Sequence, residues 1–117
     1  MMYYSYVSEE RVAFVLKDYV DVHFQEDITR DTLSDLSYYN PDYAARLFKK
    51  ETGMSFKSYV IEKRVDLARH LLCTSMMPIH EVAEKVGYDN YSYFTRVFKR
   101  VTGKTPIEYR VDYWNEE

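Results

Sequence analysis

The feature that most constrains this chain is an internal repeat. Residues 43–53 (YAARLFKKETG) and 93–103 (YFTRVFKRVTG) share their tyrosine, arginine, phenylalanine, lysine, threonine and glycine at an offset of fifty. Upstream, Leu33 matches Val82 at an offset of forty-nine, so the second copy has one extra turn residue. Each copy has a short helix, a tight turn and a longer helix that ends in Thr-Gly, which is the layout of a helix-turn-helix.

Proline and glycine mark the ends of the expected helices. The prolines follow three predicted helix starts, at Asn40-Pro41, Met77-Pro78 and Thr105-Pro106. Glu108 lies three residues after Thr105 and completes a capping box. The three glycines each follow a helical run, where a left-handed closing residue is needed: Gly53, Gly87 and Gly103.

Apolar spacing predicts an all-α chain of about seven helices, with no convincing strand. The first helix opens after Ser8, and the others are expected at residues 31–37, 41–52, 56–73, 78–86, 91–102 and 106–113. We expect the first helix to bury Val12, Val15, Leu16, Tyr19 and His23. The helix at 41–52 should bury Ala44, Leu47 and Phe48, and that at 91–102 should bury Phe94, Val97, Phe98 and Val101.

These helices predict two helix-turn-helix subdomains joined by a long linker helix. The expected segments are an N-terminal amphipathic helix (1–28), the first helix-turn-helix (29–54), the linker helix (55–76), and the second helix-turn-helix with a C-terminal helix (77–117). Two second helices on one connector could enter successive major grooves of one duplex. The segment 1–28 either forms a dimer contact or covers the first helix-turn-helix.

Composition and charge limit the class of protein. The 117 residues suit one ordinary domain, and a lone cysteine, Cys73, excludes an internal disulfide and fits a reducing, cytoplasmic setting. We expect Cys73 to be a small core residue. No apolar run is long enough to span a membrane, and no signal peptide is recognisable. The net charge is −3, but residues 46–110 carry +6 between stretches of −6 and −3, which indicates an anionic partner for that segment.

Residues 29–110 resemble the DNA-binding domain of AraC/XylS-type bacterial transcriptional regulators. The second copy, residues 79–110, carries most of the resemblance, and residues 40–56 and 64–72 are also similar. The first turn departs from the family, with Tyr38 where glycine is usual and with Ser34 and Ser37 in the short helix. The resemblance implies sequence-specific binding of double-stranded promoter or operator DNA. It also makes RNA polymerase and a preceding sensor or dimerisation domain candidate partners.

Helical spacing places the candidate base-reading residues opposite the apolar faces. They are Asp42, Ala45 and Arg46 in the first copy, and Tyr91, Ser92, Thr95 and Arg96 in the second. Arginine can give two hydrogen bonds to guanine, whereas Asp42 could accept one from cytosine but would repel a phosphate.

The candidate phosphate contacts are backbone amides at helix starts and nearby side chains. They are Asn40, Tyr43, Lys49, Lys50, Asn90, Tyr93, Lys99, Arg100, Lys104 and Thr105. For the lysines, an ordinary solvated surface explains the pattern equally well. Tyr43 and Tyr93 are also expected to be partly buried supports, with hydroxyl groups that reach the backbone.

The sequence bears on two other classes of function, a protein-interaction module and an enzyme. A helical protein-interaction module that has lost or weakened DNA binding is the alternative, supported by Asp42, Tyr38 and the acidic ends of the chain. An enzyme is not expected, because there is no paired-carboxylate site and no phosphate-binding glycine loop. The three histidines and Cys73 lack metal-ligand spacing, so neither a catalytic residue, a metal nor a cofactor is predicted.

Overall fold

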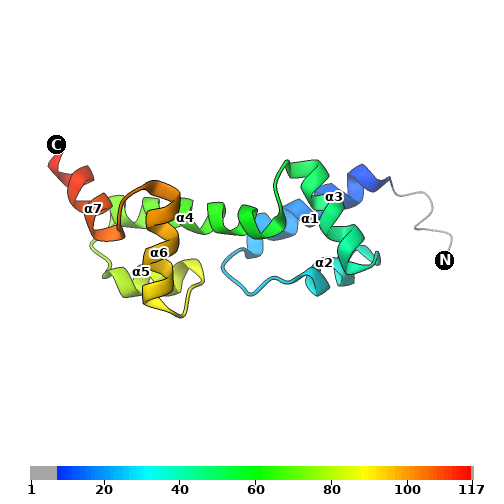
Figure 1. The fold of residues 1–117 in the computed structure, drawn as a ribbon, viewed down its shortest axis with the longest axis horizontal. Coiled ribbons are helices and arrows are strands. Elements are labelled where there is room, and N and C mark those ends of the chain that lie inside the picture. Colours follow the sequence, from blue (N-terminus) through cyan, green and yellow to red (C-terminus); the bar gives the residue numbers. More distant parts are fainter. Residues whose placement is uncertain (1–7, 117) are drawn as a thin grey trace. The chain divides into compact units, whose positions relative to one another are not determined.

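The computed structural model describes residues 8–116, which form seven helices and no strand, so the all-α expectation is confirmed (Figure 1). The helices are α1 (Glu9–His23), α2 (Arg30–Ser37), α3 (Pro41–Thr52), α4 (Phe56–Thr74), α5 (Ile79–Val86), α6 (Tyr91–Thr102) and α7 (Pro106–Asn115). Residues 1–7 and 117 of the expected terminal segments lie outside the described residues. The chain divides into two compact units, residues 1–60 and 61–117, and α4 runs from the first into the second.

In the first unit, α1 and α2 both pack against α3. The shared core is formed by Leu16, Val20, Leu33, Ala44, Phe48, Phe56 and Val60. Because α1 contributes Leu16 and Val20 to this core, it is part of the packing that supports α3. The expected burial of Ala44, Leu47 and Phe48 is confirmed.

The inward face expected for α1 was partly wrong. Its buried residues are Ala13, Leu16 and Val20, whereas Val15 is 48% exposed. The apolar residues of α1 surround much of the helix, and Phe14 is also exposed. Periodicity alone therefore allowed two apolar faces, and packing against α3 selected the one centred on Leu16.

In the second unit, α5 and α6 pack together and enclose a core with the second half of α4. The core comprises Val65, Ala68, Leu72, Val82, Ala83, Val86, Tyr88, Phe94, Val97 and Phe98. The expected inward residues of α6 are confirmed, with Phe94 and Phe98 fully buried and Val101 partly buried. The unburied side of α6 is thereby directed away from this core.

Helices α3 and α6 begin and end as the sequence predicted, and their ends have the same local geometry. The Oδ1 atom of Asn40 accepts a hydrogen bond from the Tyr43 amide at 2.8 Å, and Asn90 does the same for Tyr93 at 2.8 Å. Both helices close on a glycine in the left-handed region. The ends of α3 and α6 are therefore set by local signals that the repeat duplicates.

At other helix ends the predicted bounds differ slightly from those in the structure. Pro78 is the N-cap of α5 and makes no side-chain cap, so it is not the first helical residue as expected. Three further ends differ by one or two residues: α2 starts at Arg30, α4 ends at Thr74, and α7 ends at Asn115.

The turn between α2 and α3 uses tyrosine where a glycine would be expected. Tyr38 has φ 66°, in the left-handed region, and its amide donates to the Ser34 carbonyl at 2.8 Å. The serines noted as departures stabilise this turn, because Ser34 donates to the Tyr39 carbonyl at 2.6 Å and Ser37 donates to the Leu33 carbonyl at 2.8 Å. The turn is thus built from serine hydroxyls and one strained residue.

Replacing Tyr38 by glycine should raise the free energy of unfolding by about 0.5–1 kcal/mol, because glycine adopts a positive φ without a Cβ clash. The Tyr38 side chain is 73% exposed, so little buried surface is lost. Urea denaturation followed by circular dichroism measures the change. Tyr39→Gly is the matched control and should destabilise, since Tyr39 packs on the core. A loss of stability in Tyr38→Gly would show that its side-chain contacts outweigh the backbone strain.

The capping box of α7 predicts a pH dependence. The Thr105 amide donates to Glu108 Oε1 at 2.9 Å, and this hydrogen bond lowers the pKa of Glu108. A lowered folded-state pKa stabilises the fold above the ordinary glutamate range, and this stabilisation is lost as the pH falls through the folded value. Glu108→Gln should therefore lower the melting temperature at neutral pH, and the difference from the wild type should disappear as the pH falls below the ordinary glutamate range and through the lowered pKa of Glu108. A difference that is independent of pH would contradict this role of Glu108.

Candidate nucleic-acid interface

The outer face of α3 carries charged side chains opposite the buried ones. Asp42, Arg46 and Lys49 are exposed, and they follow one another at helical spacing. Ala45 lies between them but is partly buried against the core of the first unit. The candidate base-reading residues of the first copy therefore share one face, on which Ala45 offers only a methyl group.

The outer face of α6 is similar but lacks an acid. Ser92, Arg96 and Lys99 are exposed, and Tyr91 is 44% exposed. Thr95 is partly buried, and its hydroxyl donates to the Tyr91 carbonyl at 3.1 Å. The Thr95 methyl group and its hydroxyl oxygen, acting as an acceptor, are thus what this residue can offer to a ligand.

An arginine and a tyrosine are paired in the same way in both copies. The Arg46 guanidinium carbon lies 5.5 Å from the centroid of the Tyr43 ring, and the Arg96 carbon lies 5.9 Å from that of Tyr93. Such cation–π contacts at exposed sites are weak, about 0.5–1 kcal/mol. They leave the guanidinium groups exposed while restricting where they lie. Neither arginine is sequestered in the core of its unit, so both can reach a ligand.

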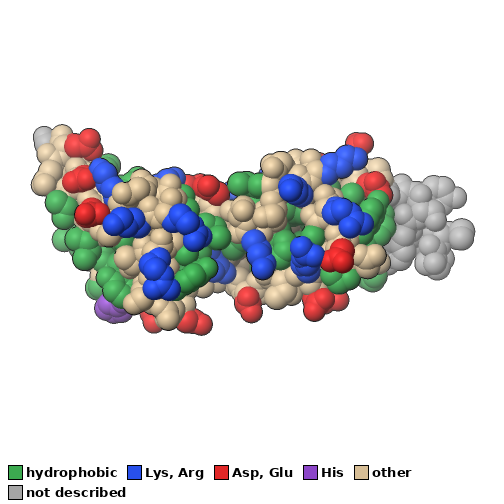
Figure 2. Space-filling view, in the orientation of Figure 1, with side chains coloured by type: hydrophobic (Ala, Val, Ile, Leu, Met, Phe, Trp, Pro, Cys, Tyr) green, Lys and Arg blue, Asp and Glu red, His purple; other side chains and the backbone are tan. Residues whose placement is uncertain are grey.

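Further basic residues surround these faces. Lys49, Lys50, Lys99 and Arg100 are all exposed. Figure 2 shows Lys and Arg side chains over α3 in the first unit and over α6 in the second. Lys104 differs, because its ammonium group donates to Asp112, and this hydrogen bond raises the pKa of Lys104. It is therefore less available to a phosphate than the other four.

Two tyrosine expectations need correction. The Tyr43 hydroxyl donates to the Glu9 carboxylate of α1, not to the backbone. This contact links α1 to the start of α3 and could not be predicted from residues so distant in sequence. Tyr93 is 44% exposed instead of partly buried, and its ring contacts the Tyr88 ring at 5.7 Å.

Cys73 is not a core residue as expected but is only partly buried. Burial raises the pKa of its thiol, although the nearby Arg110 acts in the opposite direction. A raised pKa disfavours the thiolate that a nucleophile or metal ligand requires. Across residues 8–116, His, Cys, Asp and Glu side chains form no cluster of three or more that could hold a metal ion.

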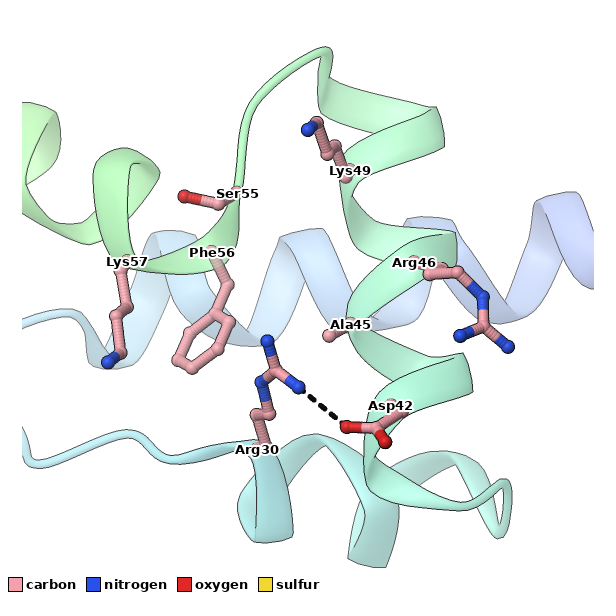
Figure 3. Close-up of a pocket in the computed structure, with 8 residues that line it drawn as sticks. All are labelled: Arg30, Asp42, Ala45, Arg46, Lys49, Ser55, Phe56 and Lys57. Atoms are coloured by element: carbon pink, nitrogen blue, oxygen red, sulfur yellow. Dashed lines mark hydrogen bonds and ion pairs between the residues drawn. The ribbon is translucent and has the colours of Figure 1, made fainter.

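A hollow beside α3 contains residues that the sequence reasoning missed. It is lined by Arg30, Asp42, Ala45, Arg46, Lys49, Ser55, Phe56 and Lys57, and Figure 3 shows Arg30 directed toward Asp42. Arg30 Nη1 lies 2.5 Å from Asp42 Oδ1. Arg30 is the first residue of α2 and Lys57 is in the first turn of α4, so neither lies on α3 or α6. Only packing brings them to this surface.

Comparison with known proteins agrees with this helical architecture. The family described as "Helix-turn-helix domain" matches residues 33–111, which is more than half of the chain. The chain is also similar to the C-terminal domain of AraT, a response regulator from Geobacillus stearothermophilus, with a TM-score of 0.82 and 34% identity, covering 86% of this chain and 84% of that one. This chain belongs to the AraC-type helix-turn-helix family.

Other members of the AraC-type family include regulators longer than this chain. This chain is 36% identical over 92 residues to the regulatory protein PocR of Salmonella typhimurium. The matched residues make up 79% of this chain and 30% of PocR. The DNA-binding domain of AdpA, a global transcriptional factor solved in complex with a target DNA, has a TM-score of 0.83 and 27% identity, covering 90% of this chain and 95% of that one. The chain spans less than half the length of the curated relatives it matches.

One structural observation concerns membranes. Among the described residues, none of the helices combines the length and the apolar character needed to cross a bilayer.

Proposed function

We propose that this chain binds double-stranded DNA sequence-specifically and so regulates transcription, with α3 and α6 each entering a major groove. The observation that carries the proposal is the pair of exposed arginines, Arg46 and Arg96, at matched positions on two helices of equal length with the same types of cap. The likeness to the AdpA domain, which was solved with its DNA, supports it.

Arg46 and Arg96 have the right chemistry for direct base readout. A guanidinium can donate two parallel hydrogen bonds to O6 and N7 of guanine, and each such contact contributes about 1–3 kcal/mol of discrimination. Each arginine is the sixth residue of a helix of 12 residues, at the end of the N-terminal half, which is the half that helix-turn-helix proteins direct at base edges. The tyrosine ring beside each arginine limits its rotamers, which reduces the entropy lost on binding.

The other exposed cations suit contacts to the DNA backbone. Lys49, Lys50, Lys99 and Arg100 lie toward the C-terminal ends of α3 and α6. The backbone N–H groups of Asp42, Tyr91 and Ser92 lie at the N-terminal ends of these helices. Phosphate contacts set the register of a protein on the duplex and carry no sequence information. These residues therefore contribute affinity, whereas Arg46 and Arg96 contribute base preference.

The salt dependence of binding tests this division. The logarithm of the association constant should fall linearly with the logarithm of salt concentration, with a slope of about −0.9 per phosphate contacted. Lys99→Ala should weaken binding by the same factor on all duplexes. It should also make the slope shallower by about one, which corresponds to the loss of one phosphate contact. Fluorescence anisotropy with labelled duplexes at several salt concentrations measures both. A response that does not change with salt would contradict DNA binding by these faces.

The alternative of a protein-interaction module is favoured by one observation. Ile107, Val111 and Trp114 are exposed along α7 at helical spacing, and each is about half exposed. This apolar stripe is compatible with DNA binding by α3 and α6, because α7 lies outside both recognition helices. We also propose that the chain contacts RNA polymerase, and that in a longer protein a sensor or dimerisation domain precedes it.

A further inference from the structure

The ion pair between Arg30 and Asp42 is unusual for its position. It joins the first turns of α2 and α3 at 2.5 Å, and the side chains of Arg30 and Asp42 are 56% and 71% exposed. An ion pair this exposed contributes little to folding. Its placement on the outer face of a recognition helix suggests a role in binding.

Among the described residues that line the hollow beside α3, Asp42 is the one acid. The hollow beside α3 is lined by four cations, Arg30, Arg46, Lys49 and Lys57, and by no other acid (Figure 3). A bare carboxylate at this place would be repelled by the phosphates of a bound duplex. The Arg30 guanidinium offsets that charge and fixes the direction of the carboxylate.

The carboxylate of Asp42 retains an acceptor atom for a ligand. Arg30 donates to Oδ1, and within residues 8–116 no group donates a hydrogen bond to Oδ2. An ionised carboxylate only accepts hydrogen bonds. In the major groove, cytosine presents an amino donor with no acceptor of its own beside it, whereas adenine presents its amino donor next to the acceptor N7, which repels a carboxylate. Guanine presents the acceptors N7 and O6, and thymine presents the acceptor O4. Asp42 therefore favours cytosine and disfavours guanine and thymine at the base it meets.

The second copy has no counterpart of this pair. Ser92 occupies the position of Asp42 at the offset of fifty, and Ile79 corresponds to Arg30 at the upstream offset of forty-nine. A serine hydroxyl both donates and accepts, so it tolerates several bases. Helix α3 therefore requires a particular base opposite Asp42, whereas α6 has no such requirement opposite Ser92.

We infer that Arg30 positions and neutralises Asp42 so that the carboxylate selects cytosine in one half-site, which makes the DNA site asymmetric and gives the bound chain a direction. This inference rests on the proposed function. Asp42 is the specificity-determining residue and Arg30 is a positioning residue, because Arg30 acts through the carboxylate.

Selection of bound sequences from a random duplex library tests the role of Asp42. The wild-type chain should enrich cytosine at one position of one block of bases. In Asp42→Asn that preference should fall about tenfold and shift toward adenine, since an amide can accept from N6 and donate to N7 of adenine, and the other block should be unchanged. Ser92→Asn is the matched control, and it should alter the other block alone.

The outcomes separate this inference from the proposed function. If the wild-type chain enriches no sequence, both are overturned. If it enriches a site whose base preferences Asp42→Asn leaves unchanged, the asymmetry inference alone is overturned. Circular dichroism of each variant shows that a changed preference does not come from unfolding.

A double-mutant cycle on the selected duplex tests the role of Arg30. Arg30→Gln should weaken binding severalfold when Asp42 is present and much less in the Asp42→Asn background. Lys57→Gln, which removes another cation from the same hollow, should have the same effect in both backgrounds. Equal effects of Arg30→Gln in both backgrounds would overturn the positioning role.

Discussion

Phe98→Ala should lower the free energy of unfolding of the second unit by about 3–5 kcal/mol. Phe98 is fully buried in α6, and its ring centroid lies 5.8 Å from that of Phe94 and 5.4 Å from that of Tyr109. Truncation removes the transfer free energy of the ring and leaves a cavity that these aromatic neighbours only partly fill. Because Phe98 anchors α6 from the side opposite Arg96, this loss should also impair DNA binding.

Urea denaturation followed by circular dichroism measures this effect. Phe14→Ala is a matched control of the same residue type, since Phe14 is 59% exposed on α1. Its free energy of unfolding should change by no more than about 0.5 kcal/mol. A loss below about 1 kcal/mol for Phe98→Ala would contradict the core described for the second unit.

Arg96→Ala should weaken binding to the selected DNA site by about ten- to a hundredfold, and it should flatten the preference for guanine at one position. The Arg96 side chain is exposed, and its guanidinium group lies over the Tyr93 ring. Its removal therefore costs the fold little. Arg46→Ala should do the same in the other half-site, because Arg46 has the matching contact with Tyr43.

Arg96→Lys separates base readout from charge. Lysine retains the positive charge but lacks the planar fork that gives two parallel hydrogen bonds. The slope of binding against salt should therefore stay close to that of the wild type, while the guanine preference weakens. If Arg96→Lys and Arg96→Ala lose the same affinity and slope, Arg96 acts through charge alone and the base-reading role is wrong.

Local signals made α3 and α6 predictable from the sequence. Each begins at an asparagine N-cap and ends at a left-handed glycine, and these groups act within a few residues of one another. The repeat supplied the same signals twice, so the exposed positions of Arg46 and Arg96 followed from helical spacing. The roles proposed for these arginines are predictions that binding experiments must test.

Features that depend on packing between helices could not be predicted. The face that α1 buries was misjudged because Val15 and Leu16 are both apolar, and only α3 decides between them. The contact of Tyr43 with Glu9 and the pair of Arg30 with Asp42 join residues on different helices. Neither carries a sequence signal, since no spacing rule links side chains across separate helices.

The central claim is that one chain reads DNA with two arginine-bearing helices, and selection from a random duplex library at two salt concentrations tests it most directly. The account predicts two blocks of enriched bases, centred about one helical turn or 10–10.5 base pairs apart, each holding a guanine. The blocks should persist at higher salt while overall affinity falls. Sequences recovered without enrichment at either salt concentration would contradict the account.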